Sequence, residues 1–189
     1  MLVSNWEDCI VSYFDLIDTR KTIASENSEA TELMRQLHAL THKSINIDMP
    51  FHRHAYAWND SAIFLAFPKT NGDYETVMRE LNEVKPRFDE IRHSYAICVK
   101  GQAIPEPPCA YGTEVNGQPK FIFLKASGYA FKNCFTVEER LKKHGMDWYI
   151  DSWITRKIRN FPKTDRCKVA MLPTNRKRAI CILKGQIWR

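Results

Sequence analysis

Stretches rich in apolar, β-branched and aromatic residues alternate along the chain with stretches in which apolar residues recur every three or four positions. The first pattern is typical of buried β-strands and the second of amphipathic helices. Their alternation predicts an α/β sandwich, in which helices pack on a mixed sheet. Strands are predicted over residues 9–17, 53–58, 61–67, 95–99, 120–126, 169–172 and 178–185.

Three segments have helical periodicity. In residues 19–43 apolar positions recur at helical spacing, with a polar break expected near 25–28. Residues 73–92 form the clearest amphipathic helix, which Pro86 is expected to kink or end. A third helix is predicted over residues 128–143.

Short polar segments join these elements. Asn59-Asp60, between two apolar runs, is a signal for a hairpin turn. The Pro-rich segment 104–120 predicts a solvent-exposed loop or a β-arm, and residues 147–154 predict a short strand that leads into a short helix.

The composition is that of a folded domain, since 44% of the 189 residues are hydrophobic and only 7 are Gly and 9 Pro. That length is typical of one domain, so residues 1–189 are predicted to form a single domain. No apolar run reaches the ~18 residues of a membrane span, and the N-terminus lacks the features of a signal peptide. We therefore expect a cytoplasmic protein without a membrane partner.

The formal net charge of +6 suggests an anionic partner, although much of it comes from the last third of the chain and a solvated basic face explains it equally well. The six cysteines form no CxxC pair and no close cluster with histidine. In a cytosolic chain they are expected to be reduced core residues.

Two carboxylates stand out as candidate chemistry. Asp15 ends a predicted buried strand, and Asp60 lies in the tight turn between two strands. Apolar strands rarely carry Asp unless something compensates its charge. Two carboxylates at strand ends suit Mg²⁺ or Mn²⁺, which prefer oxygen ligands and bridge to substrate phosphates. Considered alone, each carboxylate also has a purely structural explanation, Asp60 as a turn residue and Asp15 as a cap.

The residues around both carboxylates resemble the metal motifs of the class III nucleotidyl cyclases. YFDLIDTRKT, with Asp15, is similar to the first motif, in which an Asp ends the first strand within Asp-Ile-x-Gly-Phe-Thr; YAWNDSAIF, with Asp60, is similar to the second, in which Gly-Asp lies in a β-hairpin. Three further features match that family. They are the separation of Asp15 and Asp60, the order of the predicted elements, and a helix that begins at Gly128 and carries Glu138. The resemblance covers roughly residues 8–185 and implies a ferredoxin-like cyclase domain with a mixed, mostly antiparallel sheet.

The resemblance also implies a chemistry. Asp15, Asp60 and the backbone carbonyl of Leu16 would hold two divalent ions, Mn²⁺ or Mg²⁺. One ion would help to deprotonate the ribose 3′-hydroxyl and the other would clamp the triphosphate, so that the 3′-oxygen attacks the α-phosphorus and pyrophosphate leaves.

Two positions decide the substrate in that family. The residue four before the second Asp reads the base and is Tyr56 here; a second reader falls on Lys125, so neither purine pattern is present. A Tyr at the first position resembles the pyrimidine cyclases of the bacterial Pycsar antiphage systems, whose cyclic nucleotide activates a separately encoded effector. Lys125 only donates hydrogen bonds and uracil O4 accepts them, which favours UTP; CTP is the alternative.

The chain departs from the family at several positions. The helix Asn and Arg that act on the ribose and the transition state fall on Lys132 and Thr136, with Asn133 one position out of register. Either Lys132 and Asn133 substitute for them, or the alignment slips by one. Asp18 replaces the glycine of the first motif; we favour a helix-capping role for it over a metal ligand.

Several basic residues are candidates for the triphosphate, because phosphate groups need cations at several points. They are Lys100 and the cluster Arg176, Lys177 and Arg178.

The family further implies a homodimer with active sites at the interface, where one chain supplies the metal carboxylates and the other the base reader and helix residues. One alternative is a non-catalytic nucleotide sensor with the cyclase fold, which the missing Asn and Arg would allow. Another is a ferredoxin-like nucleic-acid-binding domain that uses the C-terminal basic residues. The lack of an aromatic RNA-binding strand argues against a nucleic-acid partner.

Overall fold

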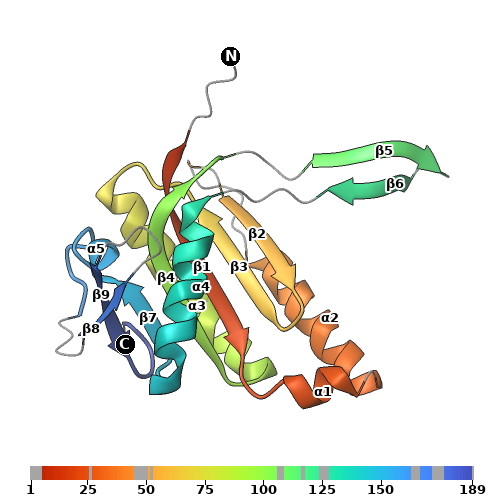
Figure 1. The fold of residues 1–189 in the computed structure, drawn as a ribbon, viewed down its shortest axis with the longest axis horizontal. Coiled ribbons are helices and arrows are strands. Elements are labelled where there is room, and N and C mark those ends of the chain that lie inside the picture. Colours follow the sequence, from red (N-terminus) through yellow and green to blue (C-terminus); the bar gives the residue numbers. More distant parts are fainter. Residues whose placement is uncertain are drawn as a thin grey trace.

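A sheet of seven strands lies at the centre of the structure (Figure 1). In a computed structural model, its strands are β1 (Glu7–Leu16), β2 (Arg53–Trp58), β3 (Ser61–Ala66), β4 (Ser94–Ala103), β7 (Trp148–Asp151), β8 (Cys167–Met171) and β9 (Lys177–Leu183), in the order β2-β3-β1-β4-β7-β9-β8. The structure describes residues 6–25, 27–44, 51, 53–105, 109–115, 118–123, 128–162, 167–171 and 177–188.

Strand β1 determines the arrangement of the sheet. It pairs antiparallel with β3 on one side and with β4 on the other, and residues 9–14 are buried. The strand is almost continuously apolar because both of its faces are covered. Only β4 and β7 pair in parallel among the described strands, so the sheet is mixed and mostly antiparallel, as predicted.

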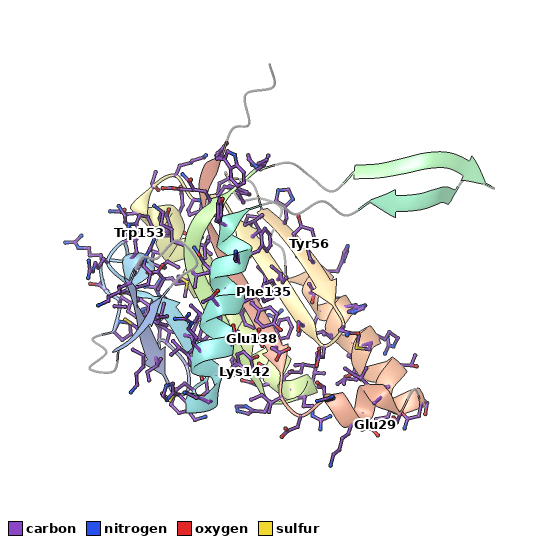
Figure 2. All side chains as sticks on the ribbon, in the orientation of Figure 1. Glu29, Tyr56, Phe135, Glu138, Lys142 and Trp153 are labelled. Carbon is purple, nitrogen blue, oxygen red and sulfur yellow. The ribbon has the colours of Figure 1, made fainter. Side chains whose placement is uncertain are left out.

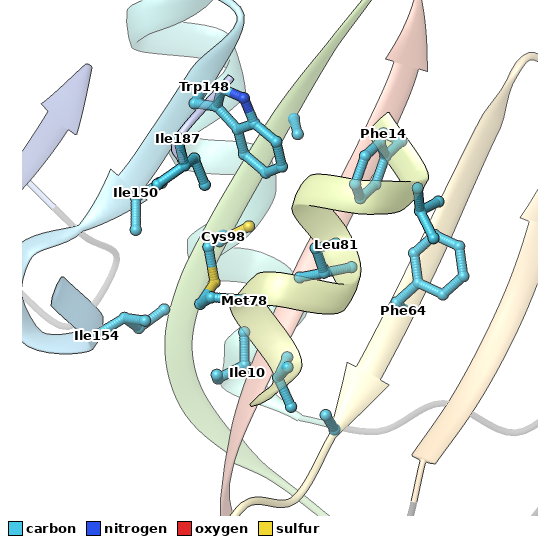
Figure 3. Close-up of a cluster of buried hydrophobic side chains, with 14 of the residues drawn as sticks. Ile10, Phe14, Phe64, Met78, Leu81, Cys98, Trp148, Ile150, Ile154 and Ile187 are labelled. Carbon is cyan, nitrogen blue, oxygen red and sulfur yellow. The ribbon is translucent and has the colours of Figure 1, made fainter. Parts of the chain in front are cut away.

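The helices divide into two layers. Helices α2 (Ser28–Lys43) and α3 (Asn71–Ile91) cover one face, and α3 packs there on a core that includes Phe14 and Trp148 (Figure 3). Helix α4 (Tyr129–Leu141) lies on the other face, against β1, β4 and β8. In Figure 1 it crosses in front of β1 and β4 and leaves β2 and β3 beside it without a helix. The remaining helical segments are α1 (Arg20–Ala24), α5 (Ser152–Thr155) and a 3₁₀ turn (Lys142–His144).

Local signals explain most helix boundaries. The predicted break near 25–28 separates α1 from α2, and the Asn27 side chain accepts a hydrogen bond from the backbone of Ala30 at 3.0 Å. Thr70 and Asp73 form a capping box at the start of α3. Of the two expected effects of Pro86, a kink or an end of the helix, the end is wrong, because α3 continues past it to Ile91. The buried Phe88 beyond it keeps the last turn packed, against a cost of about 3 kcal/mol for an interior proline.

The Pro-rich segment forms a β-arm. Strands β5 (Cys109–Val115) and β6 (Gln118–Phe123) pair only with each other and project from the body in Figure 1. The predicted strand 120–126 belongs to this arm up to Phe123, and its last residues lie outside the described part of the chain.

Two other expectations concern the whole chain. Cys9, Cys98 and Cys134 are buried and unbridged, in agreement with the prediction of reduced core cysteines, and Cys181 is buried as well. None of the helices in the described ranges has both the length and the apolar character that crossing a membrane requires.

Gly101 brings helix α4 against the sheet. A Cβ atom there would lie 2.4 Å from both Cα and Cβ of Ala130. Since backbone atoms cannot yield cheaply, we expect Gly101→Ala to lower the free energy of unfolding by about 1–3 kcal/mol. Gly72→Ala is the control, because a Cβ atom at Gly72 would lie 3.6 Å from its nearest neighbour, Oγ1 of Thr70, which is an ordinary contact distance. Urea unfolding of both variants measures the difference, and equal stabilities would contradict the close packing.

Candidate active site

The strand pairing brings the two sequence-predicted carboxylates together. Asp15 is paired with Ser61, the residue after Asp60, in the ladder between β1 and β3. The backbone N–H of Leu16 donates to the carbonyl of Asp60 at 3.2 Å. Asn59 adopts a φ of 54°, which Asn tolerates, so the turn is tight enough to place Asp60 at the end of β1. Asp15, Leu16 and Asp60 therefore form one cluster.

Three hydroxyl groups surround the carboxylate of Asp15. Ser61 Oγ donates to Oδ1 at 2.6 Å, and the Tyr13 hydroxyl lies 3.1 Å from the same oxygen. The Tyr95 hydroxyl donates to Oδ2 at 2.7 Å. We call Tyr13, Ser61 and Tyr95 the hydroxyl cage. The cage takes the place of water around a carboxylate at the end of a buried strand.

Helix α4 reaches the same carboxylate through Tyr95. The Tyr95 hydroxyl lies 2.8 Å from Oε1 of Glu138, which in turn pairs with Lys142 at 3.3 Å. Figure 2 labels Glu138 on α4 and Lys142 at the start of the 3₁₀ turn that follows it. Glu138, noted in the sequence only as the acid near the end of this helix, is thus tied to the carboxylate cluster.

Thr19 links the other two candidate ligands. Its side chain is buried; Oγ1 donates to Oδ2 of Asp60 and lies 3.4 Å from the carbonyl oxygen of Leu16. The expectation that Asp18 caps the next helix is wrong, since Thr19 occupies the N-cap position of α1. Asp18 instead adopts a φ of 59°, in the left-handed region, which explains why a glycine suits this position of the motif.

The charges in this cluster are mostly negative. Burial raises the pKa of Asp15 above its ordinary value; the Ser61 and Tyr95 hydroxyls oppose that rise, and the charges of Asp60 and Glu138 add to it. Burial, followed by the charge of Asp15, also raises the pKa of both Tyr13 and Tyr95, so these phenols remain protonated donors. None of the influences on the pKa of Asp15 comes from a basic side chain of the described residues.

The donor set fits a hard divalent cation. All the groups are oxygens, and the acids have an excess of negative charge that a cation would relieve. Among the described residues no cluster of three or more His, Cys, Asp or Glu side chains could hold a metal. Two carboxylates and a carbonyl suit Mg²⁺ or Mn²⁺, which keep several waters and bind substrate phosphates.

The predicted base reader lies on the same face of the sheet. Tyr56 pairs with Ile63 of β3, which pairs with Tyr13 of β1, so the three side chains form one row. Burial raises the pKa of Tyr56, which is half-buried and stacks on His54 with ring centroids 6.5 Å apart. Phe135 of α4 borders this row and contacts the Tyr13 ring at 5.5 Å; Figure 2 labels both Tyr56 and Phe135. Lys125 lies outside the described residues.

The two helix candidates differ in burial. Lys132 is exposed on α4. Asn133 is buried, and its Nδ2 donates to the carbonyl of Lys100 at 3.4 Å. Asn133 Oδ1 is buried without a hydrogen bond from any described residue. The structure therefore places Lys132, rather than Asn133, on the surface that a ligand can reach.

Lys100 and Arg178, two of the predicted triphosphate residues, are paired with acids away from the carboxylate cluster. Lys100 pairs with Asp8 at 2.8 Å and lies over the Trp153 ring. Along β4 it is five residues beyond Tyr95, the residue that pairs with Asp15. Arg178 pairs with the buried Asp151 at 2.8 Å. Lys177 is exposed, and Arg176 lies outside the described residues.

Sequence reasoning missed the hydroxyl cage and Thr19. Alternation along β1 does place Tyr13 on the face of Asp15, two residues away. The positions of Ser61 and Tyr95 follow only from the register of β1 with β3 and β4. That register is a long-range property that no short motif contains.

Comparisons with known proteins identify the fold. No protein-family model matches the sequence, and no curated protein sequence matches it. The structure is similar to the crystal structure of the guanylyl cyclase Cya2, with a TM-score of 0.62 and 10% identity over 97% of this chain and 94% of that chain. It is also similar to two structures of a bacterial light-regulated adenylyl cyclase, with TM-scores of 0.66 and 0.63 at 9% and 7% identity.

The likeness extends over nearly the whole chain. Each light-regulated structure matches 98% of this chain and 54% of its own, so this chain spans about half of their length. At such low identities the likeness shows the fold: the chain has the mixed α/β fold of the nucleotidyl cyclases. This confirms the fold class that the two short motifs implied.

The raised pKa of Asp15 gives a prediction for stability. Because the folded state holds this proton more tightly than the unfolded state, the contribution of Asp15 to stability is present at low pH and is lost as pH rises through the raised pKa. In metal-free buffer at pH 8, Asp15→Asn should therefore raise the free energy of unfolding, and the gain should disappear below the ordinary pKa of Asp. Urea titrations from pH 8 down to about pH 3, below the ordinary Asp pKa of 3.8, test this, with Asp18→Asn as the exposed control. A less stable Asp15→Asn protein at pH 8 would contradict it.

Proposed function

We propose that the protein is a pyrimidine nucleotide cyclase that converts UTP to 3′,5′-cyclic UMP and pyrophosphate. The observation that carries this proposal is the meeting of Asp15 and Asp60 at one edge of the sheet in a fold shared with guanylyl and adenylyl cyclases. In the reaction, the 3′-oxygen forms a bond to the α-phosphorus while the bond from that phosphorus to the bridging oxygen breaks.

The residues of the chain divide this work between them. Asp15, Asp60 and the Leu16 carbonyl would hold two Mn²⁺ or Mg²⁺ ions, which when bound supply Lewis-acid activation of the 3′-hydroxyl and neutralise the triphosphate. Lys132, exposed on α4, would meet the charge that develops on the phosphoryl group. No side-chain nucleophile is needed.

Base selection falls to Tyr56 and Lys125. The Tyr56 hydroxyl stands on the open face of the sheet in a row with Tyr13, where a bulky phenol leaves little room for a purine. Lys125 would donate to uracil O4, which favours UTP over CTP. Cytidylate cyclase activity, with CTP as the substrate, is the alternative if Lys125 faces a different edge of the pyrimidine base.

The cellular role follows from the product. A cyclic pyrimidine nucleotide is a diffusible signal, so the product would act on a separately encoded effector, as the Pycsar resemblance implies for antiphage defence. The enzyme would work in the cytoplasm as a homodimer with active sites at the interface.

A second candidate is a non-catalytic nucleotide sensor. The inward orientation of Asn133, whose amide contacts the Lys100 carbonyl, favours it, because the family's ribose-orienting Asn is then not available. The turnover experiment below separates the two functions.

Turnover of the four ribonucleoside triphosphates with Mn²⁺ is the direct test. We expect cyclic UMP and pyrophosphate, with UTP preferred over ATP and GTP by about 10²–10⁴, since each mispaired buried group costs roughly 1–3 kcal/mol. Asp60→Asn should lose about 100-fold or more in rate, because it removes a charge that holds the cations. Asp73→Asn, in the cap of α3, is the matched control. Chromatography and pyrophosphate release provide the readout.

Each other outcome has its own meaning. ATP or GTP as the best substrate would refute the pyrimidine assignment, and CTP would refute only the role of Lys125. Full activity in a folded Asp60→Asn protein would refute the two-cation site. Binding of nucleotide without any turnover would favour the sensor.

Shared sites predict complementation between two inactive variants. If Asp15 and Tyr56 act in the same site from different chains, a heterodimer of Asp15→Asn and Tyr56→Ala contains one intact site. A statistical mixture should then recover about one quarter of the wild-type activity. Tagged subunits allow heterodimers to be isolated and assayed, with each homodimer as the control. Isolated heterodimers without activity would place Asp15 and Tyr56 in the same chain's site.

A further inference from the structure

The hydroxyl of Tyr95 lies between two carboxylates that belong to different elements. It is 2.7 Å from Oδ2 of Asp15 on β1 and 2.8 Å from Oε1 of Glu138 on α4. A phenol has one proton, so Tyr95 donates to only one of these acids at a time. Because both carboxylates lie within hydrogen-bond distance of the same hydroxyl oxygen, the position of that oxygen limits how far apart they can be.

The ring of Tyr95 is held firmly in place. Its side chain is 6% exposed and contacts the rings of Tyr13 and Tyr149 edge-on, with centroids 6.4 Å and 6.2 Å apart. A phenol has no freedom to move its oxygen except by moving the ring. The hydroxyl is therefore a fixed point against which the Asp15 carboxylate is oriented.

The hydrogen bonds of Asp15 leave its two oxygens in different states. Oδ1 has two hydroxyl neighbours, Ser61 at 2.6 Å and Tyr13 at 3.1 Å, which can fill both of its lone pairs. Oδ2 has only Tyr95 among the described residues. One lone pair of Oδ2 therefore remains open for a further ligand.

We infer that Tyr95, assisted by Ser61, is a positioning residue that turns the Asp15 carboxylate so that Oδ2 faces a divalent cation. This inference rests on the proposed cation site at Asp15 and Asp60. Ser61 occupies Oδ1, Tyr95 sets the angle of Oδ2, and Glu138 ties that setting to α4. Cation binding and the position of α4 are thereby coupled through a single hydroxyl.

The test measures cation binding rather than turnover. Loss of free Mn²⁺ signal in electron paramagnetic resonance gives the Mn²⁺ affinity of the wild-type protein and of Tyr95→Phe, which keeps the ring and removes the hydroxyl. We expect an affinity about tenfold lower, as for other residues that orient a metal ligand without touching the metal. Ser61→Ala, which removes a single oxygen at little risk to folding, should lower it in the same direction.

Two matched controls separate positioning from general destabilisation. Tyr149→Phe removes a buried phenol hydroxyl that contacts only the backbone of Lys142 and Met146. Ser12→Ala removes a buried serine hydroxyl from β1 on the face opposite Asp15. Both controls should retain the wild-type Mn²⁺ affinity even where urea unfolding shows a loss of stability.

The outcomes distinguish this inference from the proposed function. If Asp15→Asn loses Mn²⁺ binding but Tyr95→Phe and Ser61→Ala keep the wild-type affinity, the positioning role is wrong and the cation site stands. Equal losses in the cage variants and in the controls would also overturn it. A wild-type protein that binds no Mn²⁺ in an Asp15-dependent manner would overturn both.

Discussion

A carboxylate withdrawn from water at the end of the central strand is the constraint around which the candidate site is built. β1 lies inside the sheet, and residues 9–14 are buried, yet it carries Asp15 one residue before its end. An isolated buried charge is costly, and three hydroxyls from β1, β3 and β4 lower that cost without supplying a positive charge. Among the described residues, none of the influences on the pKa of Asp15 is a positive charge, so a bound cation would supply the compensation that the hydroxyls do not.

Helices cover the two faces of the sheet to different extents, and the less covered face is the one on which ligands can reach Asp15. Helices α2 and α3 seal one face over an apolar core. On the other face α4 approaches β4 closely at Gly101 and Ala130 and covers only part of the sheet. The row from Tyr13 to Tyr56 thus lies beside the edge of the helix, where Phe135 remains 45% exposed. A covered face beneath and a partly covered face above leave this surface within reach of a ligand or of a second chain.

The helices and strands were easier to predict from the sequence than the contacts that their residues make with other elements. Period-two and period-3.6 patterns located β1, the β2–β3 hairpin and α3, and they placed Asp15 and Asp60 at strand ends. They failed at Pro86, where the packing of Phe88 outweighs the local preference, and at Asp18, whose conformation rather than its side chain matters. Ser61 and Tyr95 were not predictable, since their roles depend on which strands pair and in what register. The inward turn of Asn133 likewise depends on how α4 sits on β4.

The distribution of cations argues that one chain does not complete the nucleotide site. A nucleoside triphosphate brings several negative charges to a cluster that already contains Asp15, Asp60 and Glu138. Among the described residues, the ion pair that reaches this cluster is the one between Glu138 and the exposed Lys142. Lys100 and Arg178 are engaged by Asp8 and Asp151, away from the level of Asp15. In the proposed function, divalent ions would offset part of this charge, and Lys132 together with cations from outside the described part of the chain would meet the rest. In the proposed shared-site dimer, a second copy of the chain that faces this surface would contribute such cations together with the base reader.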